Sequence, residues 1–353
     1  MKGQKEEQNK LLTGGDSLMA YETEKHETQY CFPAINSSCI MGKRSRHEYN
    51  LMYVFFSLLS AWTVFLNLLV IISISHFKKL HTPTNLIILS LAVADLLIGL
   101  IVMPVDAIKL IETCWYFGDT LCDLFMIIMG VLSSISLSNL VLIAVDHYEA
   151  VCHPLLYPQK ITMTKTLVSI CLCWFFSSAY NTVIVINNKY VDPSNRKDEC
   201  YGECTFTVSF TFTVIDAIYS FLLPCSVMIT AYLRIFYVVN QQVKVINSMI
   251  KSGKCVKEGS VRRKSERKAA LTLGIIVTVY LLCLIPYYIL SLTGTTVISF
   301  TIMTFLFWTF YINSGLNPLI YALFYSWFKI SVKHILTLKI LKPESSLMDI
   351  FTG

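Results

Sequence analysis

The chain has 353 residues, of which 54% are hydrophobic and 15% are charged, and its formal net charge is +6. Soluble domains carry roughly 25% charged residues, and a soluble helical protein of this composition would lack the polar surface to cover its apolar faces. The composition therefore excludes an ordinary soluble domain.

The apolar residues gather in seven long runs separated by short connections. A run of about 18 or more apolar residues can cross a bilayer as a helix, whereas one of about 10–14 is typical of a buried core helix. The runs occupy residues 51–75, 84–111, 119–145, 166–187, 205–239, 269–293 and 298–324. The sequence thus predicts an all-α membrane protein, a seven-transmembrane helix bundle with a short amphipathic eighth helix. We expect residues 1–50 to form an extracellular N-terminal segment, 51–324 the bundle, and 325–353 a cytoplasmic amphipathic helix and tail.

The N-terminal segment is polar and lacks the basic start and apolar centre of a cleaved signal peptide. We therefore expect the first helix to act as an uncleaved insertion signal. The segment contains Asn36-Ser37-Ser38, a glycosylation acceptor pattern that is used when it faces a secretory lumen.

Lysine and arginine are concentrated on one side of the bundle. Cytoplasmic loops carry an excess of these residues. Lys43, Arg44 and Arg46 before the first run favour one orientation, but a larger excess of Lys and Arg further along the chain favours the opposite one. That bias lies between the fifth and sixth runs and after the seventh, at Lys244, Lys251, Lys254, Lys257, Arg262, Arg263, Lys264, Arg267, Lys268, Lys329, Lys333, Lys339 and Lys342. We expect a multi-pass protein of the plasma membrane with its N-terminus extracellular.

The cysteines agree with this orientation. Of 12 cysteines, six fall on the outer side or at outer helix ends, where an oxidising compartment favours disulfides: Cys31, Cys39, Cys114, Cys122, Cys200 and Cys204. Those within helices are small apolar core residues. No pair of cysteines has the spacing of metal ligands, so the sequence predicts no metal centre.

Short motifs occur in each run, in a fixed order. They are Asn67 in the first run, Leu91-Ala92-Val93-Ala94-Asp95 in the second, Trp115-Tyr116-Phe117-Gly118 before Cys122, Asp146-His147-Tyr148 at the end of the third, Trp174 in the fourth, Pro224 and Tyr232 in the fifth, Cys283-Leu284-Ile285-Pro286 in the sixth, and Asn317-Pro318-Leu319-Ile320-Tyr321 in the seventh. In this order they resemble the rhodopsin-like (class A) G-protein-coupled receptors, from about residue 50 to 342.

A narrower resemblance is to the trace amine-associated receptors. It lies in His81-Thr82-Pro83-Thr84-Asn85, Cys200-Tyr201-Gly202-Glu203-Cys204, the stretch from Ser265 to Gly274, and Leu323-Phe324-Tyr325-Ser326-Trp327-Phe328-Lys329. The resemblance implies a Cys122–Cys204 disulfide and a second bridge from the N-terminal segment to Cys200, for which we prefer Cys39 over Cys31. It also implies an olfactory receptor for amines that needs no cofactor. Its partners would be a heterotrimeric G protein of the stimulatory or olfactory class, arrestin, a receptor kinase and membrane lipids.

Asp95 lies near the middle of the second run. Carboxylates inside a helix bundle are costly, and they usually have a function. With Ser136, Asn313 and Asn317 expected close to it, Asp95 forms either a hydrogen-bonded polar knot or an oxygen-lined pocket for a structural sodium ion. The two interpretations are compatible.

Asp216 is the candidate ligand anchor. It lies about two helical turns outward of Pro224 and shares a helical face with Ser220. An ammonium ion would supply the counter-charge that a carboxylate at this depth needs. The alternative, a carboxylate paired with a neighbouring helix or with water, stays open.

Met129 marks a departure from the wider family. Aminergic receptors place the amine-binding Asp on the third helix, seven residues after the bridging cysteine, and that position is Met129 here. Some fish trace amine receptors instead carry an Asp on the fifth helix, at the position that Asp216 matches. The resemblance therefore implies a ligand held by the fifth helix, with Met129 as a polarisable apolar wall.

Aromatic residues of the sixth and seventh runs complete the expected pocket. Their faces stabilise an ammonium ion by about 0.5–2 kcal/mol each, although ordinary packing explains them as well: Tyr287, Tyr288, Trp308 and Tyr311. Asp106 would bind the second charge of a diamine, or else pair with Lys109.

The inner end carries the expected switch and coupling surface. In the family, an Arg after Asp146 pairs with a carboxylate on the sixth helix when the receptor is off. Here that position is His147, and the carboxylate is Glu266. Neutral imidazole pairs weakly with a carboxylate, which predicts a loosened off-state lock, with higher ligand-free signalling or weaker G-protein engagement. The remaining switch residues are Tyr148, Tyr232, Pro318 and Tyr321, while Leu284 replaces a usual Trp and Tyr280 a usual Phe.

Other functions are weighed against this one. No Ser/His/Asp set, zinc-protease motif or phosphate loop indicates an enzyme, and no nucleic-acid partner is expected. Transporters show internal repeats, which this chain lacks. A receptor-like protein with impaired or constitutive signalling stays open because of His147 and Leu284.

Overall fold

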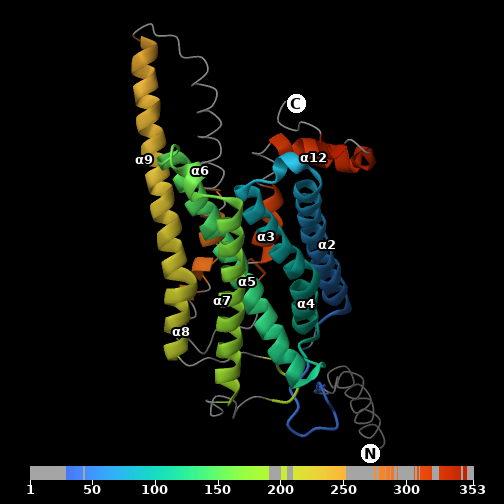
Figure 1. Ribbon diagram of the computed structural model, residues 1–353. Helices are drawn as coiled ribbons and strands as arrows, with labels where there is room; N and C mark the ends of the chain where they lie inside the picture. Colours follow the sequence, from blue (N-terminus) through green and yellow to red (C-terminus); the bar gives the residue numbers. More distant parts are fainter. Residues whose placement is uncertain are drawn as a thin grey trace, which may run out of the picture.

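The computed structural model (Figure 1) describes residues 29–42, 44–190, 200–204, 210–251, shorter stretches between 274 and 319, 326–342 and 345–347. In these ranges the chain is helical apart from the outer and inner connections. Five described helices are long and apolar enough to cross a membrane. The sixth and seventh predicted spans are described in part, as helical residues.

Helix α2 (Arg46–His76) begins at a capping box, in which Ser45 and Glu48 each satisfy the other's backbone N–H. The helix therefore starts five residues before the predicted run, because the cap and not the first apolar residue sets its beginning. One face is buried, including Val70 and Ile74, while Trp62 and Phe65 stay exposed on the opposite face. An apolar outer face is expected of a helix that contacts lipid.

The second span consists of α3 (Pro83–Leu97), a π-helical turn η2 (Ile98–Val102) and α4 (Met103–Glu112). Thr82 caps the start and Pro83 occupies the first turn, where a missing N–H costs nothing. Pro104 lies just beyond the π-helical turn. π-Helical turns occur mostly as single turns inside α-helices, where they interrupt the regular pattern of backbone hydrogen bonds.

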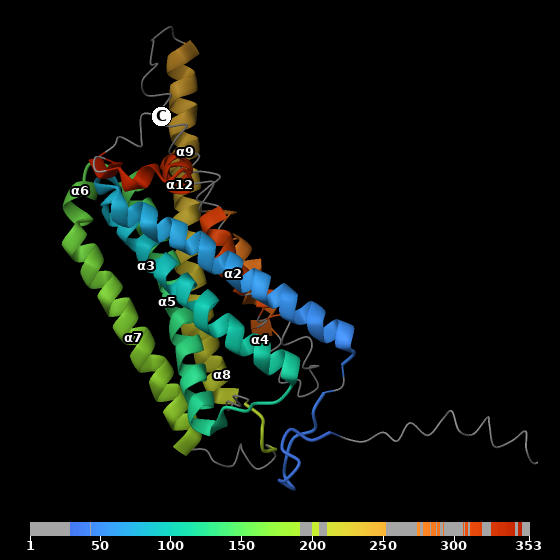
Figure 2. The ribbon, with the colours of Figure 1, turned by 90° about the vertical axis from the view of Figure 1, so that its right-hand side faces the viewer.

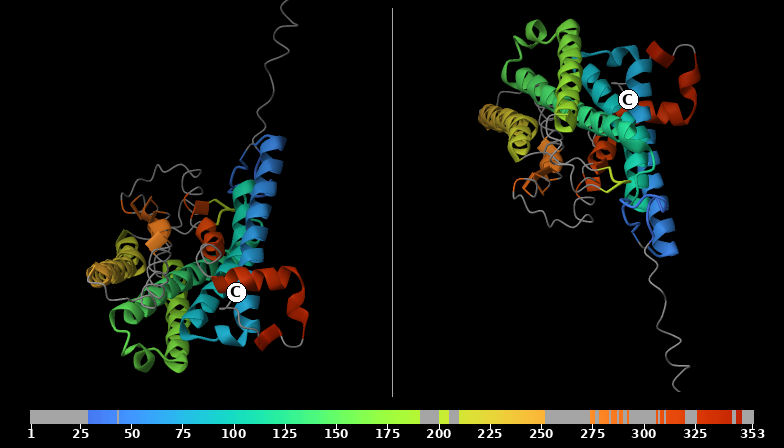
Figure 3. Two further views of the ribbon diagram at one scale, coloured as in Figure 1. Left: turned by 90° about the horizontal axis from the view of Figure 1, so that it is seen from above. Right: turned by 90° about the horizontal axis from the view of Figure 1, so that it is seen from below.

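Helix α5 (Gly118–Cys152) is the central element, since it packs against α3, α7 and α9. The end-on views in Figure 3 show it crossing the middle of the bundle. Helix α7 (Met163–Tyr190) lies outside it and exposes Leu167, Phe175 and Phe176.

The fifth span comprises α8 (Phe210–Ala217), a second π-helical turn η4 (Ile218–Leu222) and α9 (Leu223–Lys251). Residues 205–209 of the predicted run lie outside the described ranges. The helix continues well past the predicted end at residue 239, and Figure 1 shows α9 extending beyond the other helices.

The two ends of the bundle differ. Short helices occupy the inner end: η1 (Lys78–Leu80), α6 (Tyr157–Lys160), α12 (Ser326–Leu336), η5 (Lys339–Leu341) and η6 (Ser345–Leu347). Helix α12 lies across the helix ends and contacts α2, and Figure 2 shows residues 29–42 at the opposite end. The amphipathic eighth helix predicted after the seventh span corresponds to α12.

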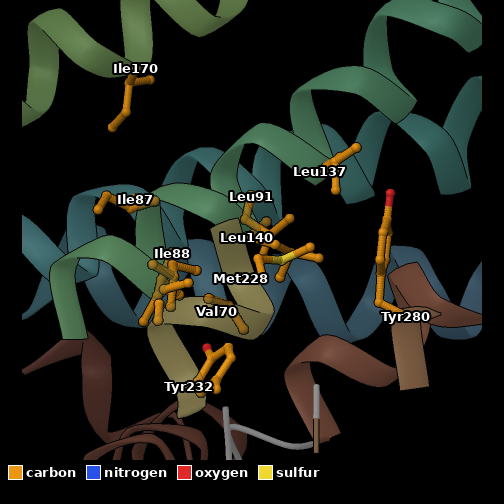
Figure 4. Packing of buried hydrophobic residues seen from close by; sticks show 14 of the residues in the cluster. Val70, Ile87, Ile88, Leu91, Leu137, Leu140, Ile170, Met228, Tyr232 and Tyr280 are labelled. Atoms are coloured by element: carbon orange, nitrogen blue, oxygen red, sulfur yellow. The ribbon is translucent and has the colours of Figure 1, made fainter. Parts of the chain in front are cut away.

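The buried core joins the inner halves of the spans (Figure 4). Val70, Ile88, Leu91, Leu140 and Met228 converge there from α2, α3, α5 and α9. Tyr280 of the sixth span belongs to the same cluster and stands at its edge in this view. Because a packed interior holds helices in fixed rotations, this core determines which side chains face the cavity outward of it.

Candidate functional site

A cavity of about 160 Å³ lies between five of the spans. Helix α5 lines one wall with Met129, Gly130, Ser133, Ser134 and Leu137. Helix α7 contributes Asn181, and the fifth span contributes Asp216 and Ser220. The remaining lining residues come from the sixth span (Tyr280, Leu284 and Tyr288) and the seventh (Leu306 and Tyr311). The lining is mainly apolar and aromatic, with a few convergent polar groups, as small-molecule sites usually are.

Asp216 is the acidic group of this cavity, and three hydroxyl groups converge on it. Ser220 Oγ donates to its Oδ1 at 2.8 Å, and Tyr180 Oη donates to the same oxygen at 3.0 Å. Tyr288 Oη lies 3.5 Å from Oδ2, at the limit of a hydrogen bond. Neutral donors from α7, η4 and the sixth span therefore position the carboxylate.

The Asp216 carboxylate takes part in none of the salt bridges found between residues that the structure describes. Hydroxyl donors orient a carboxylate but leave its charge uncompensated. A cation entering a partly desolvated cavity would gain more from such a charge than it would in water. The site is therefore suited to a small cationic ligand.

Met129 of α5 and Tyr311 of the seventh span meet at the wall of the cavity. Tyr311 Oη contacts Met129 Sδ at 3.4 Å, and both line the cavity. Tyr288 stacks on Phe221 with ring centroids 4.6 Å apart, so one of its faces is already covered. Tyr288 therefore lines the cavity with its position fixed by this stack and by the contact of its hydroxyl with Asp216.

Sequence reasoning missed Asn181, which lines the cavity, and Tyr180, which donates to the Asp216 carboxylate without lining the cavity. A Tyr–Asn pair inside an apolar run is a polar signal of the kind that Asp216 gave. Asn181 Nδ2 donates to Ser134 Oγ at 3.1 Å, which ties α7 to α5 beside the cavity. Tyr280 and Leu284 were identified as departures from the family pattern, and both line the cavity.

Two proposed ligand residues lie elsewhere, and one cannot be placed. Trp308 lines a different groove, where it stacks on Phe56. Asp106 is not among the residues lining the cavity, and its partners are Lys109 and Tyr311. Tyr287 lies outside the described residues.

Asp95 forms a buried polar knot. Ser136 Oγ donates to its Oδ1 at 2.9 Å and Asn317 Nδ2 to its Oδ2 at 2.8 Å. Asn67 Nδ2 donates to the carbonyl oxygen of Ser314, which joins α2 to the seventh span. Asn313 is buried as well.

At the inner end, Asp146 is held by two neutral donors. Thr84 Oγ1 donates to its Oδ2 at 2.7 Å, and Tyr157 Oη donates to its Oδ1 at 2.8 Å. Desolvation, together with the Asp146 carboxylate, raises the pKa of Tyr157 to about 12, so its hydroxyl stays protonated and able to donate. His147 Nδ1 lies 3.7 Å from Asp146 Oδ2. Glu266 and Tyr321 lie outside the described residues, whereas Tyr148, Tyr232 and Pro318 are buried or half-buried.

Three disulfides join the outer connections. Cys122–Cys204 and Cys39–Cys200 have the pairings that the resemblance implies. The third, Cys31–Cys114, was not predicted and ties the N-terminal segment to the outer end of α4. Cys39, Cys200 and Glu203 form the cluster of possible metal ligands among the described residues, but its two cysteines are joined in a disulfide.

The bundle, its outer disulfides and a carboxylate cavity between the spans are the features of a seven-transmembrane receptor. Residues 66–321 match the family model described as "7 transmembrane receptor (rhodopsin family)". The chain therefore belongs to the rhodopsin family of G-protein-coupled receptors, which are not enzymes.

Comparison with similar proteins shows to which group of receptors within the rhodopsin family the chain belongs. The chain is 40% identical to trace amine-associated receptor 13c of Danio rerio, over 93% of this chain and 98% of that one. It is 38% identical to trace amine-associated receptor 6 of Rattus norvegicus, over 92% and 96%, and 38% identical to receptor 8a of the same species, over 92% and 97%. The chain belongs to the trace amine-associated receptors, amine-sensing multi-pass membrane receptors that act through G proteins.

Proposed function

We propose that this receptor detects a small amine whose ammonium group binds the Asp216 carboxylate. The observation that carries the proposal is the uncompensated carboxylate, oriented by Ser220 and Tyr180 at the edge of a mainly apolar cavity. Met129, Tyr288 and Tyr311 would contact the carbon skeleton. The receptor would act in olfaction through a G protein of the stimulatory or olfactory class.

The volume of the cavity limits the size of the ligand. At about 160 Å³ it is comparable to an engineered cavity of about 150 Å³ in another protein that holds benzene. A monocyclic arylalkylamine or a short aliphatic amine fits this space. Asp106, engaged with Lys109 and Tyr311, does not supply the second carboxylate that a diamine would need, so a monoamine is favoured.

Activation would follow from contacts that differ between two states of the bundle. Asp216 precedes the η4 turn, and Tyr288 of the sixth span reaches toward its carboxylate. An ammonium bound there would compete for the carboxylate and draw the fifth and sixth spans into a new arrangement. A ligand that binds one arrangement better shifts the equilibrium toward it.

The test is a panel of amines and neutral analogues on the full-length receptor. Cells expressing it with an olfactory-type G protein should raise cyclic AMP in response to amines, and should ignore alcohols of the same shape. Equal responses to an amine and its alcohol would contradict the proposal. Surface staining of the receptor separates a silent receptor from one that does not reach the membrane.

Asp95 offers a fit for a sodium ion. Hard cations prefer oxygen ligands, and Asp95, Ser136 and Asn317 bring oxygens together in a buried knot. Asn317 Oδ1 accepts no hydrogen bond from the described residues, which leaves it available as a ligand. The ion would supply charge compensation for Asp95. Repeating the panel with potassium in place of sodium tests this, because unchanged amine potency would exclude a role for the ion.

We expect His147→Arg to lower ligand-free signalling. The Arg would pair with Glu266 in the off state, and a partly exposed ion pair is worth about 1 kcal/mol, or roughly a fivefold shift of the equilibrium. Basal cyclic AMP measures it. Adding Glu266→Gln should abolish the effect, and no change in basal or stimulated signal in His147→Arg would refute the loosened lock.

The partners at the inner end follow from the same surface. Lysines of α12, such as Lys329 and Lys333, would contact the anionic leaflet. A G protein, and afterwards a receptor kinase and arrestin, would bind the inner end that α9 and α12 border.

The N-terminus would be extracellular, at the plasma membrane. Asn36 is exposed on the segment that the disulfides attach to the outer end, so it is open to glycosylation. We expect a glycosidase to shift the wild-type band on a gel and to leave Asn36→Gln unshifted. A wild-type band that does not move would count against this orientation.

A further inference from the structure

A cavity separate from the amine cavity is lined by Trp308. This groove, of about 520 Å³, opens between α2 and the seventh span and is lined chiefly by Arg44, Glu48, Leu51, Phe55, Trp308 and Ile312. The α2 residues recur at helical spacing on one face. We refer to it below as the α2 groove.

The α2 groove is open toward the lipid and closed toward the protein. Leu51 and Phe55 are 70% and 54% exposed at its rim, whereas Phe56 and Leu110 at its floor are buried. Exposed apolar side chains are normal on a lipid-facing helix and do not by themselves make a site. Two polar features distinguish this groove from the rest of the lipid-facing surface.

The first feature is the buried indole N–H of Trp308, a hydrogen-bond donor for which the described residues offer no acceptor. Trp308 is 5% exposed, and its Nε1 has no hydrogen-bond partner among the described residues. The indole is held firmly, stacked on Phe56 at 3.9 Å between centroids and in edge contact with Tyr311 at 5.3 Å. Buried polar groups are nearly always hydrogen-bonded, so this donor indicates a ligand that brings an acceptor, such as an ester carbonyl.

The second feature is a pair of opposite charges at the mouth. Arg44 and Glu48 both line the groove at its outer end, beside the start of α2. Guanidinium groups bind phosphate well, and a carboxylate suits a quaternary ammonium. Trp308 lies inward of these charges, against Phe56, about two turns further along α2.

We propose that the α2 groove binds a zwitterionic glycerophospholipid of the outer leaflet. The phosphate lies at Arg44, the choline-type ammonium at Glu48, an ester carbonyl accepts from Trp308 Nε1, and a chain runs along Leu51, Phe55 and Ile312. An anionic lipid lacks the group that Glu48 would bind. A hydrocarbon chain alone would leave the indole unpaired.

The groove is connected to the amine cavity through one residue. Tyr311 contacts Trp308 at its edge and Met129 in the amine cavity. A lipid that fixes the Trp308 indole therefore also fixes the wall against which an amine would pack. This consequence rests on the proposed function, whereas lipid binding itself does not.

The experiment is native mass spectrometry of the purified full-length receptor, without amine, titrated with phosphatidylcholine or phosphatidylglycerol. We expect one phosphatidylcholine retained about tenfold more tightly than phosphatidylglycerol. Trp308→Phe, which keeps the stack on Phe56 and removes the donor, should lose most of that preference, and so should Arg44→Ala. The matched controls are Trp62→Phe and Arg46→Ala, which change exposed residues of α2 outside the groove.

A second variant covers the case in which Trp308→Phe disturbs the fold. Ile312→Trp fills the groove from the seventh span and should also release the lipid. Equal retention by wild type, Trp308→Phe and Ile312→Trp would overturn the proposal. If an amine displaces phosphatidylcholine from an Asp216→Asn receptor, the groove belongs to the amine and the lipid assignment is wrong.

Discussion

Asp216→Asn should reduce the potency of amines at least about thirtyfold while leaving the receptor at the cell surface. Removing one member of a desolvated charge pair costs about 2–5 kcal/mol, and the lower limit of that range corresponds to the stated loss. The amide keeps the shape of the side chain and can still accept from Ser220 and Tyr180. The fold should therefore survive, which makes the loss of charge the cause.

The measurement is a dose–response curve for cyclic AMP, normalised to surface receptor. Charge selectivity is the sharper readout, because the variant should treat an amine and its alcohol alike where the wild type prefers the amine. Asp119→Asn, which neutralises an exposed carboxylate at the outer end of α5, serves as the matched control and should keep full potency. Full amine potency in Asp216→Asn would show that the anchor lies elsewhere.

The bundle could be predicted from sequence because its signal is long and simple. Each apolar run is much longer than a soluble core helix needs, and ordered motifs place the runs in one family. The helix ends were less predictable. Helix α2 starts at the Ser45 cap, and α9 continues to Lys251 along polar residues that a hydropathy pattern leaves out.

The rotation of each helix limited the prediction of the site. Residues three positions apart on a helix differ in direction by only about 60°, yet Trp308 and Tyr311 line different cavities although both are aromatic. The η4 turn between Asp216 and Pro224 further changes the rotation within one span. Such a turn leaves no mark in the apolar pattern, and it decides what Ser220 and Tyr219 face.

The outer disulfides show a different limit. Six outer cysteines make three bridges, and an even count was visible in the sequence. The resemblance implied two pairings and left Cys31 and Cys114 over. Pairing by elimination would have identified the third bridge, since both residues lie on the oxidising side.

Met129→Asp should restore amine detection to the Asp216→Asn receptor. Both positions line the same cavity, so a carboxylate at position 129 would face the same ligand space as Asp216 does. The double variant should regain most of the potency lost in Asp216→Asn, measured by the same cyclic AMP curves. Met129→Leu in the Asp216→Asn background keeps the apolar wall without a charge and should restore nothing.

The rescued receptor also tests in which orientation the ligand lies in the cavity. With Asp216 the ammonium points toward the fifth span, whereas with an Asp at position 129 it points toward α5. Amines with a bulky ring should therefore change their order of potency, because the ring then occupies the side near Tyr288 and Phe221 instead of the side near Met129. Met129→Asp alone places two carboxylates in one cavity, so it should respond to short diamines that the wild type ignores. An unchanged potency order in the rescued receptor would mean that cavity shape, and not the position of the carboxylate, orients the amine.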